Sequence, residues 1–411
     1  MLNKIEKWKM QFIKIWTGQA ISMLTSSVLQ MAIVWYLTER TGSSAVLSFA
    51  TLIGFLPQAV LGIFIGVYID RYNRKTIMIC ADLFIAAASL LLVVVGLFGE
   101  IPIWLIMLVL FIRSIGAAFH YPALQAVTPS IVPKEHLTKY AGYSQSFESI
   151  SMVASPAIAA VLFAVWDLNH IIFMDVVGAI LAVGLLCLVK IPHRAQEEDA
   201  GQSQGKAEVI KEVKEGFAIL KKEKGMASLL VISSLYAIIY FPIGTLYPLI
   251  TMSYFGGTFA ESSAVEVLFS VGMLAGSLLL GLVGDRINKR RAIIGSIGIY
   301  GLGVAITGLL PENGLLIFFA LSLVMGISVP FYTGVEVSII QSRIKDEYLG
   351  RILALSGSIT TITMPIGLIL SGLFSDMMGI ENWFLLLGIV TIVLAVAAKL
   401  LPSFKEIEGK K

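Results

Sequence analysis

Charged residues are scarce in this chain of 411 residues. Asp, Glu, Lys and Arg make up 14% of it, 57% is hydrophobic and the mean hydropathy is +0.87. A soluble globular domain carries about 25% charged residues. The composition therefore excludes a soluble enzyme, a nucleic-acid-binding protein and a disordered chain, and we expect neither enzymatic activity nor a nucleic-acid partner.

Cysteine and histidine are also rare. The two cysteines, Cys80 and Cys187, cannot build a disulfide framework, and the four histidines lack the spacing of a metal site. We therefore expect no metal and no cofactor. The sequence also has no phosphate-binding P-loop, so we expect no direct use of ATP. No small-residue cleavage site follows the first apolar run, which predicts that no signal peptide is removed.

Long apolar runs dominate the sequence instead. A membrane-spanning helix needs about 20 apolar residues, whereas the strands of a membrane barrel alternate apolar and polar positions. The bilayer core offers no water to the backbone, so uninterrupted runs of this length must be helical. The sequence predicts an all-α integral membrane protein with twelve transmembrane helices, at about 12–37, 45–69, 76–98, 102–124, 140–165, 170–190, 226–250, 263–284, 292–310, 315–340, 352–374 and 382–401.

The basic residues predict how these helices are oriented. If successive spans alternate in direction, 28 of the 30 Lys and Arg lie on one side, Arg40 lies on the other and Arg113 lies within a span. Basic loops stay in the cytoplasm, so we expect both termini and the polar segment 191–225 to be cytoplasmic. That segment reads as a solvated linker between bundles at 1–190 and 226–411, although part of it also fits an amphipathic surface helix.

A short motif occurs twice, with a fixed offset of 215 residues between its copies. This repeat indicates two six-helix bundles of the same orientation, arranged about an axis along the membrane normal. An asparagine precedes the basic pair in both copies, and we expect its tolerance of left-handed backbone to suit a tight turn there. The matched residues are Gly66, Asp70, Arg71, Asn73, Arg74 and Lys75 in the first copy and Gly281, Asp285, Arg286, Asn288, Lys289 and Arg290 in the second.

These motifs resemble those of the major facilitator superfamily. The repeated segment is similar to its motif A, Arg113 with Gly116 resembles motif B, and Ser151, Ser155 and Pro156 resemble the antiporter motif C with its glycines replaced. Nearly the whole chain is similar to bacterial macrolide-efflux transporters.

The resemblance implies a monomeric plasma-membrane exporter that works by alternating access. Its partners are a small amphipathic drug, protons and the lipid bilayer, and it exchanges protons for hydrophobic, cationic drugs. Two alternatives stay open: export of an endogenous metabolite such as a siderophore, or a non-transporting membrane sensor on the same fold.

Ionisable residues within the spans are the candidates for proton coupling, because each costs about 2.5–3.5 kcal/mol to insert. Arg113 and Glu148 lie at depths that differ by about 5 Å, so we predict that they pair, either as a proton switch or as a static ion pair. Asp82 and Glu336 are further candidates. Asp82 alternatively pairs with the basic loop before it. Glu336 could meet a cationic drug or could end a solvated helix, and Asp175 fits a solvated end as well as a site.

The two motif A carboxylates are candidates for a cytoplasmic gate. The resemblance implies that Asp70 faces the start of the span near Gly350 and that Asp285 faces the span of residues 140–165. Each carboxylate would then lie at a helix N-terminus, where its negative charge is favoured. The alternative is a basic loop that only sets the orientation.

Adaptable Met and aromatic side chains suit a promiscuous drug site, although the same residues also fit the core or the lipid-facing surface. A Gly-x-x-x-Gly pattern at Gly272 and Gly276 predicts close packing of two helices. The candidate substrate-binding residues are Met31, Tyr121, Phe147, Tyr240, Phe331 and Tyr332.

Overall fold

The computed structural model describes residues 2–133, 136–189, 191, 220, 222–223, 225–283, 286–344 and 346–408. Within these ranges the side chains of 2–7, 66–71, 148–150 and several other helical positions are not described. The predicted linker 191–225 therefore lies almost wholly outside the described residues.

Twelve long helices make up nearly all of the described chain, which contains no strand. Nine of them are long and apolar enough to cross a membrane, while α2, α5 and α12 contribute shorter apolar stretches in the described residues. The predicted all-α membrane fold is confirmed. The helices are α1 (Leu2–Thr41), α2 (Ser44–Arg71), α3 (Arg74–Phe98), α4 (Ile103–Ile131), α5 (Leu137–Val165), α6 (Leu168–Cys187), α8 (Met226–Leu249), α9 (Phe259–Val283), α10 (Lys289–Leu309), α11 (Leu315–Arg343), α12 (Asp346–Met378) and α13 (Ile380–Leu400).

Three shorter elements complete the described chain. A π-helical turn over Ile250–Tyr254 extends α8 beyond its predicted end. After α13, the short helix α14 (Pro402–Lys405) and a 3-10 turn over Glu406–Glu408 follow.

The repeated asparagines begin the helices that follow them. The Asn73 side chain accepts a hydrogen bond from the backbone N–H of Lys75 at 3.0 Å, and Asn288 accepts one from Arg291 at 2.9 Å. Their φ angles are −65° and −73°, so the expectation of left-handed backbone was wrong. An N-cap residue uses extended backbone and a side-chain oxygen, and asparagine supplies both.

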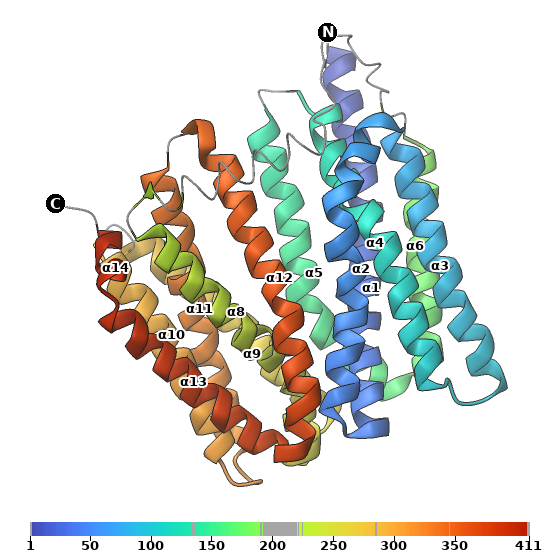
Figure 1. Cartoon of the computed structure of the whole chain (residues 1–411). Coiled ribbons are helices and arrows are strands. Elements are labelled where there is room, and N and C mark those ends of the chain that lie inside the picture. The colour runs from blue at the N-terminus through green and yellow to red at the C-terminus, as the bar shows by residue number, and fades with distance from the viewer. Residues whose placement is uncertain are drawn as a thin grey trace. The chain divides into compact units, whose positions relative to one another are not determined.

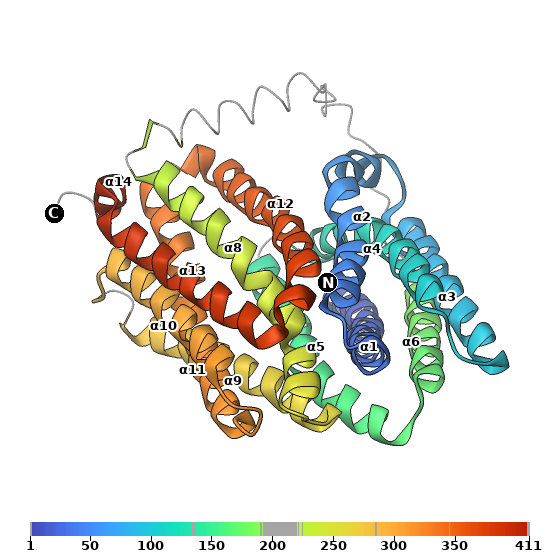
Figure 2. The same cartoon turned by 60° about the horizontal axis from the view of Figure 1, so that its bottom comes forward.

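The chain forms two compact units. One consists of residues 1–41 and 50–197 and the other of residues 42–49 and 198–411, so the first residues of α2 group with the second unit. In the first unit α3 packs on α4 and α6, and α1 on α5 and α6 (Figure 1). In the second unit α10 packs on α11 and α13, and α8 on α12 and α13 (Figure 2). Helices in matching sequence positions therefore pair in both units, as the internal repeat predicts.

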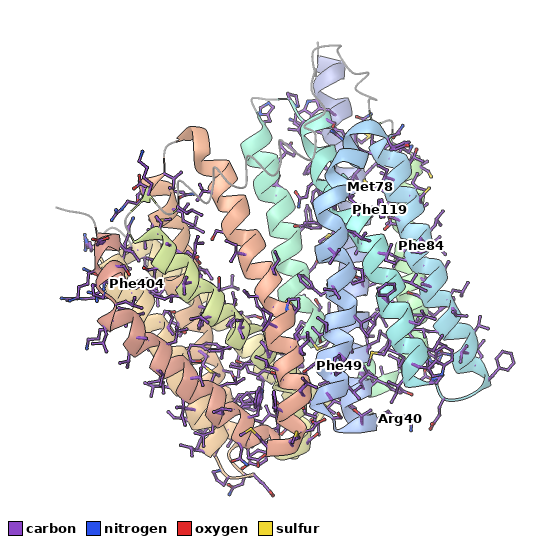
Figure 3. The ribbon with its side chains drawn as sticks, viewed as in Figure 1. Arg40, Phe49, Met78, Phe84, Phe119 and Phe404 are labelled. Carbon is purple, nitrogen blue, oxygen red and sulfur yellow. The ribbon has the colours of Figure 1, made fainter. Side chains whose placement is uncertain are left out.

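Large apolar side chains form the core of the first unit. Phe12 and Trp16 of α1 are buried with Met78 of α3 and Leu124 of α4, and Phe119 packs against this cluster (Figure 3). In a bilayer such close packing, rather than escape from water, holds the helices together.

Glycines bring α9 and α11 into backbone contact. A Cβ atom on Gly272 would lie 2.3 Å from the carbonyl oxygen of Leu323, and one on Gly276 would lie 2.3 Å from that of Ile327. Gly326 is equally confined from the α11 side, where a Cβ would lie 2.1 Å from the Phe269 oxygen. The close packing predicted from the Gly272 and Gly276 pattern is confirmed.

Candidate functional site

Arg113 forms the centre of a buried polar network that joins four helices. Its Nη1 atom lies 2.5 Å from the Oδ2 atom of Asp175 on α6, whose side chain is 1% exposed. Ser26 of α1 donates to the other carboxylate oxygen at 2.6 Å. Ser89 of α3 donates to Oδ2 at 3.2 Å and accepts a hydrogen bond from Arg113. The network thus fixes α1, α3, α4 and α6 relative to one another.

Asp175 is a member of this site that the sequence left undecided. Its solvated-end interpretation was wrong, because the carboxylate is buried and paired with Arg113. The side chain of Glu148 lies outside those described, so the pairing of Arg113 with Glu148 stays a prediction. Acidic residues are rare within membrane spans, and this rarity could have identified Asp175 as a partner of Arg113 as readily as Glu148.

A second buried carboxylate, Asp82, contacts helices α1 and α4. Gln19 donates to its Oδ2 atom at 3.4 Å, and the Nε2 atom of His120 lies 3.2 Å from its Oδ1 atom. Asp82 is 4% exposed. Its described partners are therefore in the helix bundle rather than in the basic loop before α3.

The basic residues of the repeated motif anchor the ends of neighbouring helices. Lys75 donates to the carbonyl oxygens of Cys187 and Val189 at 2.9 and 2.7 Å, at the end of α6. Arg290, its counterpart, donates to the Lys399 carbonyl at 2.5 Å, at the end of α13. Cations are favoured at helix C-termini, where carbonyl groups lack partners.

The other basic pair contacts the last turns of α4 and α11. Arg74 donates to Ser130 of α4 at 2.5 Å, and Lys289 lies 3.4 Å from both the Ser338 carbonyl and the Ser342 hydroxyl of α11. Arg286 lies in the turn before α10, where its backbone N–H donates to Val283. A Cβ atom on Gly281 would meet no other atom within 4 Å. The surroundings of the remaining members of the two copies are not described: Gly66, Asp70, Arg71 and Asp285.

The residues of the antiporter-like motif are buried in α5. Ser151 and Ser155 are 6% and 2% exposed, and the Ser155 hydroxyl donates to the Ser151 carbonyl. Pro156 follows inside the same helix. The Ser155 hydroxyl thus has its hydrogen-bond partner in the backbone of its own helix.

A carboxylate occupies the first turn of α2. The Asp376 side chain accepts hydrogen bonds from the backbone N–H groups of Ser44 and Ala45 at 2.6 and 3.2 Å, and from the Ser43 hydroxyl at 2.5 Å. All four residues belong to the second unit. The motif A resemblance implies the same arrangement, a carboxylate at a helix N-terminus, for Asp70 and Asp285. The contact of Asp376 with α2 was not predicted from the sequence.

The candidate substrate-binding residues lie in three different environments. Tyr240 and Tyr332 belong to a cluster of tyrosines in the second unit, next to the candidate carboxylate Glu336. Phe147 instead stacks on Trp16 in the first unit, with ring centroids 6.3 Å apart. The three others are partly or fully exposed: Met31, Tyr121 and Phe331.

An apolar groove of about 570 Å³ lies on the first unit between α3 and α4. Cys80, Phe84 and Phe119 line it, and none of its lining residues carries a charge. Within the described ranges, no three His, Cys, Asp or Glu side chains are grouped as metal ligands would be.

The fold and these motifs define a secondary transporter, and the chain belongs to the Major Facilitator Superfamily, whose family model matches residues 15–249 and 229–410. It is a multi-pass membrane protein. It is 50% identical over 412 residues to "Macrolide efflux protein A" of Streptococcus pyogenes, with all of both chains covered. It is 51% identical over 330 residues to "Macrolide efflux protein A" of Enterococcus faecalis, covering 80% of this chain and 100% of that one.

Solved structures have the same fold. A bacterial homologue of the iron transporter ferroportin aligns with a TM-score of 0.72 and 16% identity, covering 97% of this chain and 99% of the other. At this identity the likeness bears on the fold alone.

Proposed function

We propose that this protein exports hydrophobic, cationic drugs of the macrolide type in exchange for protons. The observation that carries the proposal is the 50% identity to a macrolide efflux protein over the full length of both chains. The two units would alternately open a central path to either side of the membrane, with both termini and the 191–225 segment in the cytoplasm.

The buried ionisable groups supply a means of proton coupling. Arg113, Asp82, Glu336 and Glu148 are the proposed coupling residues, and we add Asp175 as the partner of Arg113. Protonation of such a carboxylate removes its attraction for a cation. The freed Arg113 would then form hydrogen bonds elsewhere, so a proton could change which helices the network holds together.

Cells that produce this protein should accumulate several-fold less radiolabelled erythromycin than matched cells without it. Because the energy is proposed to come from inward proton flow, a protonophore should remove the difference while cellular ATP is held constant. Uptake is measured by filtration before and after the protonophore. Efflux that persists after collapse of the gradient would contradict proton antiport, and equal accumulation in both cell lines would contradict macrolide export.

The motif A carboxylates are proposed to close the cytoplasmic side by contacting helix N-termini. The contact of Asp376 with the start of α2 supports this, since it demonstrates the same chemistry in the described part of the chain. A carboxylate at a helix N-terminus contributes about 0.3–1 kcal/mol at an exposed site and more when it is partly buried.

Asp70→Asn should therefore reduce export several-fold more than it reduces the amount of protein in the membrane, and Asp285→Asn should have a smaller effect. Substitution by asparagine keeps the size of the side chain while removing its charge. Export rates and quantitative blotting of membranes give the two numbers. Near-wild-type export in both variants would reduce the repeated motif to an orientation signal.

A further inference from the structure

Four tyrosines from three helices of the second unit pack against one another. Tyr236 and Tyr240 lie one turn apart on α8, Tyr300 lies on α10 and Tyr332 on α11. The ring centroid of Tyr236 lies 4.6 Å from that of Tyr332 and 5.7 Å from that of Tyr300, and Tyr240 lies 5.4 Å from Tyr300. The four rings therefore form one continuous aromatic cluster.

The carboxylate of Glu336 lies at one end of this cluster. Ser233 of α8 donates to its Oε1 atom at 2.6 Å, and Tyr332, one turn earlier on α11, also hydrogen-bonds to it. No Lys, Arg or His in the described part of the chain forms an ion pair with Glu336. Asp175 has a cation as its partner, whereas the described partners of the partly exposed Glu336 are the neutral hydroxyls of Ser233 and Tyr332.

The hydroxyl group of Tyr236 is the second feature that points to a ligand. The residue is 2% exposed, and its Oη atom has no hydrogen-bond partner among the described residues. A buried hydroxyl without a partner costs free energy, which a ligand that hydrogen-bonds to it would recover. Tyr240 and Glu336 are both partly exposed, so a ligand would reach the cluster at these two residues, while Tyr236, Tyr300 and Tyr332 are buried behind them.

We propose that Tyr236, Tyr240, Tyr300, Tyr332 and Glu336 bind the protonated amine of a hydrophobic organic cation. Aromatic faces attract a cation within about 6 Å of the ring centroid, and the carboxylate supplies the opposite charge. The N–H of the ammonium group would donate to the Tyr236 hydroxyl or to Glu336. The proposal deepens the proposed function and rests on it, since it assigns the amine of the exported drug to this site.

Binding to the purified full-length protein tests the site separately from export. The probes are radiolabelled erythromycin, which carries a basic tertiary amine, its N-oxide, which lacks one, and tetraphenylphosphonium, a hydrophobic cation unrelated to macrolides. We expect Glu336→Gln to weaken binding of both cations by about 10-fold or more and to leave N-oxide binding unchanged.

Tyr236→Phe separates a binding role from a structural one. It should weaken erythromycin binding by about 10-fold, leave tetraphenylphosphonium binding unchanged, and keep or raise the unfolding temperature of the empty protein, because it removes a hydroxyl without a partner. The matched controls are Tyr254→Phe and Glu261→Gln. In the wild type the Tyr254 hydroxyl donates to the Leu310 carbonyl, and the Glu261 carboxylate accepts a hydrogen bond from Thr258. Both should bind all probes as the wild type does.

The outcomes distinguish the two proposals. Wild-type erythromycin binding that neither Glu336→Gln nor Tyr236→Phe weakens would overturn this site while leaving macrolide export intact. Tetraphenylphosphonium binding that depends on Glu336, without any erythromycin binding, would support the site and overturn the macrolide proposal. A wild type that binds neither cation would overturn the site.

Discussion

Arg113→Ala should abolish measurable drug export and lower the unfolding temperature of the purified protein. The substitution leaves the Asp175 carboxylate buried at 1% exposure without its cation. Removing one partner of a buried ion pair costs about 3–5 kcal/mol, because the remaining charge cannot reach water. Ser26 and Ser89 would also lose their contacts with the guanidinium group.

A double substitution separates stability from transport. Arg113→Leu together with Asp175→Leu removes both charges, and replacing a buried pair by apolar residues is often neutral or stabilising. We therefore expect this variant to regain the unfolding temperature while export stays absent, if the network is part of the transport cycle. Export restored along with stability would show that the pair only holds helices together.

Arg40→Ala is the matched control for Arg113→Ala. Arg40 pairs with Glu100 at the surface, where its side chain is 38% exposed and that of Glu100 is 77% exposed (Figure 3). Water and ions screen such a pair, so its loss should change neither export nor the unfolding temperature. Equal losses in Arg40→Ala and Arg113→Ala would contradict the role assigned to burial.

Gly272→Leu should prevent accumulation of folded protein. Even the Cβ of alanine at this position would lie 2.3 Å from the Leu323 carbonyl oxygen, a rigid backbone atom of the facing helix. Helices α9 and α11 would have to separate, which breaks the contacts on which packing within a bilayer depends. Overpacking of a well-packed core costs about 1–3 kcal/mol or more.

The milder pair Gly272→Ala and Gly295→Ala provides the quantitative comparison. Gly295 lies within α10, and a Cβ there would have no atom within 4 Å. Alanine favours a helix over glycine by about 1 kcal/mol, so Gly295→Ala should keep or raise the unfolding temperature while Gly272→Ala lowers it. Thermal unfolding of the two purified variants measures the difference. Equal unfolding temperatures would contradict the close contact of α9 with α11.

Much of the helical architecture was predictable because each helix is determined by its own sequence. The twelve apolar runs lie within the twelve long helices, with differences at the ends such as the π-helical extension of α8. The repeat was also visible in the sequence, and its basic residues occupy matching helix ends in both units. The conformation of Asn73 was predicted incorrectly. Asparagine is favoured both in tight turns and at helix N-caps, so the residue type alone does not separate the two.

The candidate sites were predictable only in part. Arg113, Asp82 and Glu336 were recognised as costly ionisable groups within spans, and all three have described polar partners. Their partners were not predictable, because each pair joins different helices. Asp175 is 62 residues from Arg113, and Ser233 is 103 residues from Glu336.

The sequence by itself determined that this is a helical membrane protein with an internal repeat, since hydrophobic length and the repeated motif are properties of the chain read locally. Only the tertiary structure decided which polar groups of different helices meet: Arg113 with Asp175, Asp82 with His120, and Ser233 with Glu336. The physical reason is that a helix satisfies its own backbone in the bilayer whatever surrounds it, whereas a buried side chain finds a partner only once the rotation and depth of each neighbouring helix are set.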